Sequence, residues 1–374
     1  MTMLLSQEQE LLKDSAQAFL AGQAGVARQR ALRDAGASAG FDPGVWQQMA
    51  EMGWTVGALP EEHGGLAAGY LGMGAVFEAV GRNLSASPLL SQAIIAPELL
   101  IRAGSRAQQD HWLPLLAQGA ARVALALDEK SGRHLAGMAT TACQTSIGWE
   151  LSGAKYFVLD GVQAQAFIVA SVSPQGAPGL WLVPADAAGV RIERQSLIDS
   201  RNAAKVVFSQ VALTADMALV GMDAGAALDA ALDRARACLA AEALGLLREV
   251  FARTVAYLKE RVQFDVAIGS FQALQHRAAR LYVELELLES CVLSALEAVD
   301  AGNEADIALH ASLAKAKAAD LCATLCNEAV QMHGGIGVTD ELDIGLFLKR
   351  ARMLQCTFGD AGFHRRRFAQ LKGF

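Results

Sequence analysis

The chain of 374 residues has little proline, a modest share of charged residues and no long apolar run. It contains only 8 prolines, and because proline interrupts helices, this scarcity favours a mainly helical protein. No apolar run reaches the roughly 18 residues that cross a bilayer, so we expect no membrane span. Hydrophobic residues make up 53% and charged residues 19%, a composition that excludes a disordered chain.

The chain also has fewer positively than negatively charged residues, which gives a net charge of −7 and a pI near 5.6. Nucleic-acid binding requires basic surface, so this balance argues against a nucleic-acid partner. Residues 1–20 show an amphipathic helical pattern unlike a signal peptide, and we expect a cytoplasmic protein. The six cysteines lack the spacing of a zinc site, and Cys322 and Cys326, one helical turn apart, fit core packing. We therefore predict no metal site.

Hydrophobic periodicity divides the chain into three parts. Residues 1–118 show helical patterns, the first opened by Ser6 and Gln9 in the Ser-x-x-Gln form of a capping box. In residues 119–221, short apolar runs between Gly, Pro, Ser and Asp predict antiparallel strands of a small β-barrel or sandwich. Residues 222–374 return to long helical patterns with short connections, which predict a four-helix bundle. The predicted fold class is α+β, mostly α: N-terminal helical domain, middle β domain, C-terminal bundle.

The most informative stretch of the sequence is the run Gln331-Met332-His333-Gly334-Gly335-Ile336-Gly337. Paired glycines after a long helical pattern predict a tight turn, where bare backbone N–H groups can approach a phosphate or a ribose. An ordinary helix C-cap explains the same glycines, and the run alone leaves both interpretations open.

Two further segments accompany this run. One is Leu59-Pro60-Glu61-Glu62-His63-Gly64-Gly65, and the other is Arg261-Val262-Gln263-Phe264, followed by Ile268, Phe271 and Gln272. With the three-part order, these motifs resemble the acyl-CoA dehydrogenase family of flavoproteins, whose members carry a PEE(Y/H)GG turn, an RxxFGxPIxxFQ segment and a QxxGG turn. The resemblance covers nearly the whole chain.

The resemblance implies a chemistry. FAD accepts a hydride from the β-carbon of an acyl-CoA thioester while a carboxylate removes an α-proton, which gives a 2-enoyl-CoA. Electrons then leave to an electron-transferring flavoprotein. The α-proton is only weakly acidic, so the thioester oxygen must be polarised and the base desolvated.

The resemblance also places FAD across a subunit interface, with one protomer donating residues to its neighbour's site. Arg261 matches the arginine that meets the FAD phosphates, since a guanidinium fork suits a diphosphate. A solvated cation at a helix end is the alternative for this residue. The other donated positions that the resemblance assigns to the cofactor are Phe264, Ile268, Gln272, Gln331, Gly334 and Gly335.

The receiving half of the FAD site departs from the family pattern. Where relatives have Thr-Glu-Pro and then Gly-Ser-Asp, this chain has Asp128-Glu129-Lys130-Ser131-Gly132-Arg133. The resemblance still assigns Asp128 to this cofactor loop, while the proline is missing and two cations change its charge. Asp265 replaces the glycine after RxxF and adds a negative charge near the expected diphosphate.

Aromatic residues in the β part have two interpretations. Phe157 stands where a tryptophan or phenylalanine usually covers the flavin, and the resemblance makes it a cofactor contact. Core packing is the alternative for Phe157 and for its strand neighbours Trp149 and Tyr156.

The expected catalytic base is the main departure from the family. Alignment of the segment after Lys349 puts Phe358 at the glutamate of the Tyr-Glu-Gly-Thr turn, and phenylalanine cannot take a proton. Asp360, after the flexible Gly359, is the candidate catalytic base. Some relatives carry the glutamate on the first bundle helix, but this chain has Ala235 there. We expect Glu242, further along that helix, to be structural.

The tail 358–367 resembles small-subunit homologues that pair with a larger homologous subunit in dicarboxylate or steroid side-chain degradation. His364 and the following arginines face either a CoA phosphate or a partner's carboxylates, or they form a solvated basic helix face. Three functions stay open. The chain is a self-sufficient homotetrameric dehydrogenase, a non-catalytic subunit that completes a partner's FAD site in a hetero-tetramer, or a flavin-free structural homologue.

Overall fold

The computed structural model describes residues 5–37, 39–66, 68–129, 138–146 and 148–374. The positions 130–133 of the expected cofactor loop lie outside these described residues. Contacts between Cα atoms divide the chain into two units. The helical unit comprises the residues up to 30, 68–85 and 236–374, and the sheet unit comprises 31–67 and 86–235. The three predicted domain boundaries stay a prediction.

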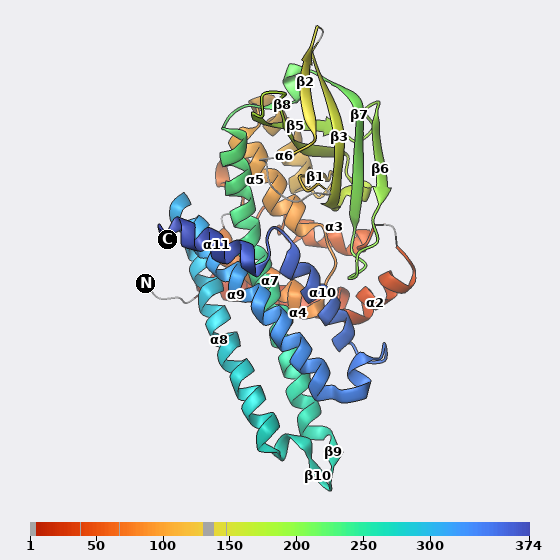
Figure 1. The fold of residues 1–374 in the computed structure, drawn as a ribbon, viewed down its shortest axis with the longest axis vertical. Helices are drawn as coiled ribbons and strands as arrows, with labels where there is room; N and C mark the ends of the chain where they lie inside the picture. The colour runs from red at the N-terminus through yellow and green to blue at the C-terminus, as the bar shows by residue number, and fades with distance from the viewer. Residues whose placement is uncertain (1–4, 38, 67, 130–137, 147) are drawn as a thin grey trace. The chain divides into compact units, whose positions relative to one another are not determined.

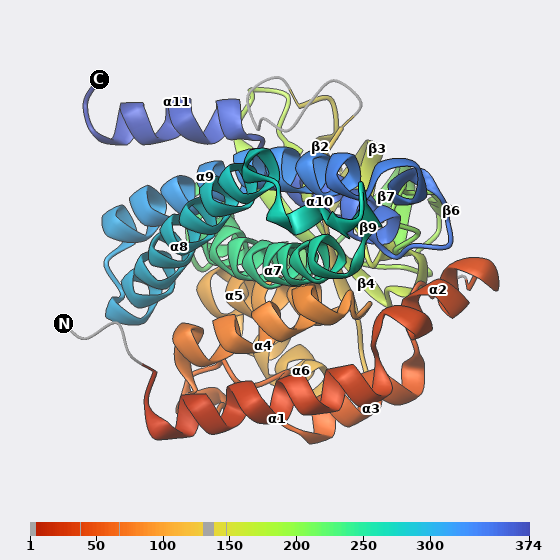
Figure 2. The ribbon, with the colours of Figure 1, turned by 90° about the horizontal axis from the view of Figure 1, so that it is seen from below.

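Long helices dominate the helical unit, as the periodicity of the sequence predicts. Helix α9 packs against α8, α10 and α11, and α4 packs against α1 and α8 (Figures 1 and 2). The helices that contribute to this unit are α1 (Gln7–Gln23), α4 (Gly69–Asn83), α7 (Ala224–Glu260), α8 (Gln272–Ala301), α9 (Glu304–His333), α10 (Ile344–Cys356) and α11 (Ala361–Leu371). Cys322 and Cys326 on α9 are buried and unbridged, which confirms their role in packing.

Two helix starts show how side chains fix the helical unit. At α1, Ser6 Oγ accepts a hydrogen bond from the Gln9 backbone N–H and Gln9 Oε1 accepts one from Ser6 N–H, so the predicted capping box is confirmed. Helix α4 has no side-chain cap of its own. Instead Asp300 of α8 accepts hydrogen bonds from the backbone N–H groups of Tyr70 (2.6 Å) and Leu71 (3.0 Å). A distant carboxylate therefore caps α4 and ties it to α8.

The sheet unit contains the predicted middle strands. In the described residues, eight strands form one sheet in the order β6-β7-β3-β2-β4-β5-β8, with β1 paired in parallel to β4. The strands are β1 (Val123–Ala126), β2 (Thr141–Thr145), β3 (Gly148–Leu159), β4 (Ala166–Val172), β5 (Pro178–Pro184), β6 (Val190–Arg194), β7 (Ala203–Leu213) and β8 (Ala218–Leu219). Most pairs are antiparallel, as predicted.

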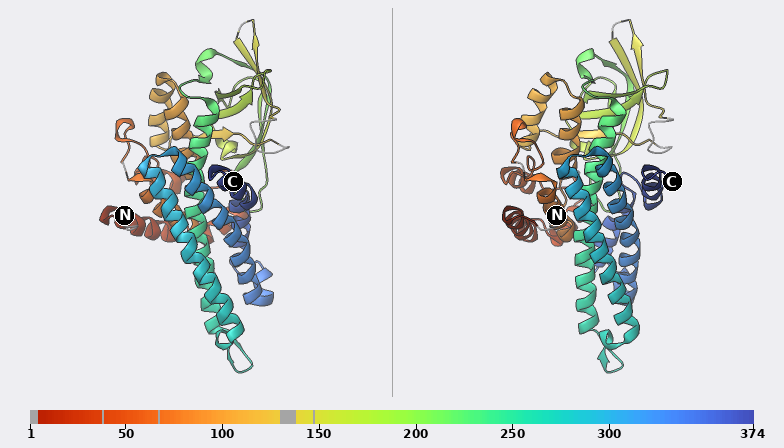
Figure 3. Two further views of the ribbon diagram at one scale, coloured as in Figure 1. Left: turned by 60° about the vertical axis from the view of Figure 1, so that its left-hand side comes forward. Right: turned by 90° about the vertical axis from the view of Figure 1, so that its left-hand side faces the viewer.

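Short helices complete the sheet unit. They are α3 (Pro43–Glu51), a π-helix η2 (Leu90–Ile95), α5 (Ala96–Ala103) and α6 (Arg106–Ala117). Helix α2 (Val26–Asp34) crosses the boundary between the two units. The sheet's core includes Phe167 of β4 and Phe208 of β7, whose rings meet edge to face at 6.4 Å. Figure 3 shows this twisted sheet and, in the helical unit, the long helices running side by side.

A two-stranded hairpin connects α7 to α8. Its strands, β9 (Val262–Gln263) and β10 (Val266–Ala267), pair antiparallel, and the short 3-10 helix η5 (Ile268–Ser270) follows them. The sequence patterns do not predict this hairpin. Within the described residues, no helix has both the length and the apolar character that a membrane crossing requires.

Candidate functional site

Arg261 lies directly after α7 and is exposed to solvent. In the part of the chain that the structure describes, its guanidinium has no hydrogen-bond or ion-pair partner, whereas its backbone carbonyl accepts a hydrogen bond from Ile268 N–H at 2.8 Å. The backbone of Arg261 is thus fixed by the hairpin while its side-chain donors stay available. A guanidinium with available donors on a fixed backbone fits an anionic ligand such as a phosphate.

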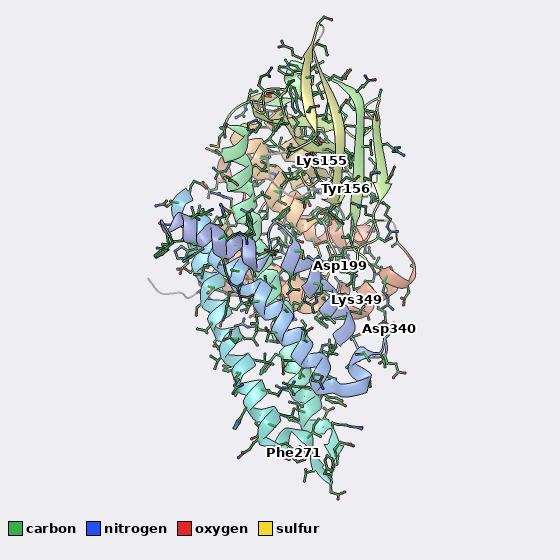
Figure 4. The ribbon with its side chains drawn as sticks, in the orientation of Figure 1. Lys155, Tyr156, Asp199, Phe271, Asp340 and Lys349 are labelled. Atoms are coloured by element: carbon green, nitrogen blue, oxygen red, sulfur yellow. The ribbon has the colours of Figure 1, made fainter. Side chains whose placement is uncertain are left out.

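The hairpin tip holds an aromatic ring in solvent. Phe264 and Asp265 are the two turn residues, and both have positive φ (54° and 65°). A two-residue type I′ turn requires this conformation, which a bulky residue such as phenylalanine adopts only with strain. The Phe264 ring is 87% exposed and meets the Phe271 ring edge to face at 6.2 Å. Figure 4 labels Phe271 at this end of the helical unit.

The glycine run forms a turn with an open backbone. It ends α9 and continues as the 3-10 helix η6 (Gly334–Val338). Gly334 has φ 66° and ψ −144°, a region that residues with a side chain rarely enter. A Cβ at Gly334 or Gly335 would meet no atom within 4 Å, whereas one at Gly337 would lie 2.7 Å from the Val330 carbonyl oxygen. Packing therefore requires Gly337, and the open space beside Gly334 and Gly335 fits an approaching ligand.

Two motifs distant in sequence are attached to neighbouring helix ends. Tyr257 in the last turn of α7 stacks on His333 at the end of α9, with ring centroids 4.5 Å apart. In the same unit, Arg277 of α8 pairs with Glu328 of α9 at 2.6 Å. The Arg261 hairpin and the glycine turn therefore follow helices that contact each other within one unit. The remaining predicted positions of this half are Gln272 and Gln331, both exposed, and Ile268, half-buried.

The predicted flavin-covering residue, Phe157, lies on β3 in the sheet unit. It is 51% exposed and has a φ of 52°, at an irregularity in the pairing of β3 with β7. Its backbone N–H donates to Gln195 Oε1 at 2.6 Å. Core packing is therefore the wrong interpretation for Phe157. It holds in part for Trp149, whose ring packs 5.5 Å from that of Trp181 in the core.

A buried ion pair that the sequence patterns do not predict joins β3 to Glu129. Lys155 of β3 is fully buried, and its Nζ donates to Glu129 Oε1 (2.9 Å) and to the Leu127 carbonyl (3.1 Å). Glu129 also accepts hydrogen bonds from the backbone N–H groups of Ala139 (2.7 Å) and Thr140 (2.9 Å). One carboxylate thereby joins residue 129 to the backbone of residues 139 and 140 and to Lys155 of β3. The only indication of this ion pair in the sequence is a lysine within a strand pattern of apolar residues.

The electrostatics of this pair follow from its burial. Burial alone favours the neutral acid, but hydrogen bonds from backbone and Lys155 outweigh it and lower the pKa of Glu129 to about 2. Burial likewise lowers the pKa of Lys155, against the attraction of Glu129. The adjacent Asp128, a predicted cofactor residue, is half-buried, and its carbonyl accepts a hydrogen bond from Tyr156 N–H at 2.8 Å. Figure 4 labels Lys155 and Tyr156 together on β3.

The turn at the expected base position, residues 357–360, contains one acid, Asp360, and this acid caps a helix. Phe358 is half-buried with a φ of 53°, and its carbonyl accepts hydrogen bonds from Arg236 Nε (3.0 Å) and His364 Nε2 (3.1 Å). Asp360 is the N-cap of α11, where its Oδ1 accepts a hydrogen bond from the Phe363 N–H at 2.7 Å. A helix cap explains Asp360 without any role in proton transfer.

His364 corrects one expectation. It is fully buried, so it neither belongs to a solvated basic face nor faces a CoA phosphate or a partner's carboxylate. Burial, with the nearby charges of Arg236 and Lys315, lowers its pKa to about 2, so the imidazole is neutral. The expectation failed because three arginines follow His364 and made the helix look solvated. Arg365 does lie on that exposed face, where it pairs with Asp320.

Glu242 has the structural role that we expected. It is 2% exposed, and its two carboxylate oxygens accept hydrogen bonds from Arg350 Nε (2.8 Å) and Nη2 (2.9 Å). This bidentate pair joins α7 to α10 and occupies both oxygens of the acid.

Backbone strain coincides with the positions that the resemblance singles out. Among the described residues, eight that are not glycine have positive φ, and three of these are phenylalanines: Phe157, Phe264 and Phe358. A large side chain in this region costs about 1–2 kcal/mol, and such strain persists chiefly where surrounding structure enforces it, often at functional sites. The coincidence supports a functional reason for all three.

Comparison with known proteins identifies the family. The family model described as "Acyl-CoA dehydrogenase, N-terminal domain" matches residues 6–120, and "Acyl-CoA dehydrogenase, C-terminal domain" matches residues 224–371. The chain belongs to the acyl-CoA dehydrogenase family. It is 32% identical to the acyl-CoA dehydrogenase FadE12 of Mycobacterium tuberculosis over 325 residues, which cover 83% of this chain and 82% of that protein. It is 30% identical over 346 residues to IpdE2 of the same organism, covering 92% and 91%.

Solved structures agree with this assignment. A variant of the Tcur3481–Tcur3483 steroid ACAD superposes with a TM-score of 0.88 at 31% identity, covering 99% of this chain and 98% of that one. The ChsE4–ChsE5 complex from Mycobacterium tuberculosis gives 0.90 at 25% identity, with both chains fully covered. A glutaryl-CoA dehydrogenase from Mycobacterium smegmatis, solved with FADH2, gives 0.89 at 22% identity and supports the fold alone.

Proposed function

We propose that this chain takes part in the α,β-dehydrogenation of an acyl-CoA thioester to a 2-enoyl-CoA, with FAD as cofactor. We propose further that it acts in a hetero-oligomer, where it completes the FAD site of a larger homologous subunit that carries the base. One contrast between two parts of the helical unit carries this proposal. The donated half is exposed and available around Arg261, whereas the base position is occupied by Phe358.

The donated residues fit the phosphate and adenosine end of FAD. Arg261 would bind the diphosphate through its available guanidinium donors. The open backbone at Gly334 and Gly335 would lie against the nucleotide, and Gln272 and Gln331 offer exposed amide groups. Phe264 would pack against the cofactor or the partner chain, because its ring is already held in solvent. When bound, FAD would provide the acceptor for the hydride that leaves the β-carbon.

For proton abstraction, this chain lacks a glutamate at the expected base position. The α-proton of a thioester requires a carboxylate base, and Asp360 is the acid on the turn after Phe358. Because Asp360 Oδ1 already accepts the N-cap hydrogen bond of α11, we favour a base from the partner subunit over Asp360. Two solved neighbours, the ChsE4–ChsE5 complex at 25% identity and the Tcur3481–Tcur3483 steroid ACAD at 31%, are named as pairs of proteins, which supports a hetero-oligomer. We propose an electron-transferring flavoprotein as the electron acceptor.

Co-expression tests this function. The chain would be purified alone and together with candidate larger homologous subunits, and bound flavin would be measured by absorbance and turnover by reduction of an acceptor dye. We expect flavin and turnover only in the co-purified assembly. Full flavin and turnover in the chain alone would support the self-sufficient enzyme with Asp360 as base, and absence of flavin in every assembly would support a structural homologue.

Arg261→Ala is the matching variant. Loss of a charge-assisted hydrogen bond to phosphate typically costs about 1.5–3 kcal/mol, so we expect flavin affinity to fall by roughly tenfold or more. Lys259→Ala is the control, because Lys259 is an exposed cation two residues away that the resemblance does not assign to the cofactor. Equal flavin retention in both variants would contradict the assignment of Arg261.

A further inference from the structure

The segment between α10 and α11 is held by side chains from three helices. Arg236 of α7 and His364 of α11 donate to the Phe358 carbonyl. Lys315 of α9 donates from its Nζ to the carbonyls of Leu354 (2.7 Å) and Gly359 (3.1 Å). Three basic side chains thus converge on the backbone of one short turn, all within the helical unit.

Stability alone does not explain this arrangement. Lys315 is 1% exposed, and a buried ammonium is costly even when its hydrogen bonds are made. His364 is fully buried, and among the described residues its Nδ1 has no hydrogen-bond partner. A buried acceptor without a partner destabilises the fold, so a phenylalanine of similar shape would be the more stable choice at that position. Phe358 adds backbone strain.

A helix C-cap is the simpler explanation for part of the network. The Leu354 carbonyl belongs to the last turn of α10, where carbonyl groups need a partner. Water or a glycine cap would satisfy that carbonyl without burying a lysine and a histidine. The cap also does not explain the two donors on the Phe358 carbonyl, which lies beyond α10. The common result of the other three hydrogen bonds is one fixed backbone shape at residues 358 and 359.

We propose that Arg236, Lys315 and His364 are positioning residues that hold Phe358 in its left-handed conformation, so that a fixed phenyl ring lines an acyl-CoA site of the assembly. This inference rests on the proposed function, because it takes the 357–360 turn as part of an acyl-CoA site. It makes Phe358 a specificity-determining residue that shapes the site sterically, at the place where relatives carry a base. The network maintains this shape at the expense of stability.

His364→Phe tests the proposal because it removes the Nε2 donor and the unpartnered Nδ1 together. Three kinds of measurement would be made on the assembled protein: the melting temperature, the amide hydrogen exchange of residues 353–364, and the kinetics (KM and kcat) for an acyl-CoA series. We expect an unchanged or higher melting temperature and exchange at Thr357 and Gly359 roughly tenfold faster, the factor that one lost hydrogen bond carries. KM should rise by a similar factor and unequally across acyl chains, with a smaller change in kcat.

Two further variants complete the experiment. His364→Gln should restore slow exchange and the original KM, because a glutamine amide can donate to the Phe358 carbonyl. Lys317→Met is the control: Lys317 is also on α9 but pairs with Glu284 of α8, away from the turn. It should change neither the exchange of the turn nor KM.

Three results would overturn the proposal. If His364→Phe lowers the melting temperature and leaves exchange and KM unchanged, His364 serves packing only. If exchange accelerates while KM and acyl preference stay the same, the turn is held but is not part of the acyl site. Slow exchange at Thr357 and Gly359 in His364→Phe would overturn the proposed network, whether or not the wild-type assembly contains flavin. Absence of flavin from the wild-type assembly would refute the proposed function but not the network.

Discussion

The buried pair of Glu129 and Lys155 gives the sharpest prediction for stability. The substitution Lys155→Met removes a fully buried ammonium and leaves the Glu129 carboxylate buried with only backbone donors. The whole fall in the pKa of Glu129 from 4.5 to about 2 corresponds to about 3 kcal/mol, and Lys155 shares this effect with hydrogen bonds from Thr140 and Ala139. Breaking a buried ion pair by removing one partner typically costs about 3–5 kcal/mol. We therefore expect Lys155→Met to lower the free energy of unfolding by about 3 kcal/mol at pH 7.

The same pair predicts a pH dependence with a definite sign. The pKa of Glu129 is lower in the folded chain than in the unfolded chain, so the unfolded chain binds more protons between pH 4.5 and about 2. The stabilisation is present above pH 4.5 and is lost as the pH falls towards 2. Lys155→Met should flatten this part of the stability profile, because the hydrogen bond and charge from Lys155 help to lower the pKa of Glu129.

Urea denaturation followed by tryptophan fluorescence would measure both effects, since Trp149 and Trp181 lie in the same unit as the pair. A double-mutant cycle with Glu129→Gln would isolate the coupling between the two side chains. Lys205→Met is the matched control, because Lys205 forms a half-exposed pair with Glu193 at 3.2 Å. We expect that control to cost less than about 1 kcal/mol. A cost for Lys155→Met no larger than the control's would refute the reasoning.

Three further predictions follow from the site and the fold. Asp300→Ala should lower stability by about 1–2 kcal/mol in thermal unfolding, because α4 loses the carboxylate that caps it, and an unchanged melting temperature would contradict that role. Asp360→Asn should keep turnover of the assembled enzyme within about twofold, because an asparagine caps α11 equally well, and a loss of turnover beyond about a hundredfold would identify Asp360 as the base. Phe264→Gly should relieve about 1 kcal/mol of backbone strain and raise the melting temperature while flavin retention falls. Unchanged retention would exclude Phe264 from the cofactor interface.

The regular elements follow from local sequence signals. The capping box at Ser6 and the long helical periodicities predict the helices to within a few residues, because each signal lies inside the element that it specifies. The β9–β10 hairpin was missed because its turn is Phe264-Asp265 and not the Asn-Gly pair that type I′ turns favour. In that case the surrounding helices impose a conformation that the turn residues disfavour.

The site was less predictable than the fold, because several of its features depend on burial that no local pattern encodes. Lys155 is charged in a strand and His364 lies beside three arginines, so both look like surface residues. Each is fully buried because a tertiary partner fixes it: Glu129 for Lys155 and the Phe358 carbonyl for His364. The sequence pattern therefore does not reveal polar residues whose burial costs stability, and the structure is needed to identify them.

The strained phenylalanines connect these observations to function. The resemblance assigns Phe157 and Phe264 to the cofactor site and Phe358 to the position of the base. A site position whose usual residue has been replaced could simply have lost its function. A change to glycine would remove the strain at Phe264 or Phe358, so the left-handed backbone under a bulky side chain makes both positions candidates for a functional role. At Phe358 the chain instead maintains the strain with two buried donors on one carbonyl. The hydrogen bonds on the Phe358 carbonyl therefore fit a turn that is held in one shape at the position where the resemblance expects a glutamate.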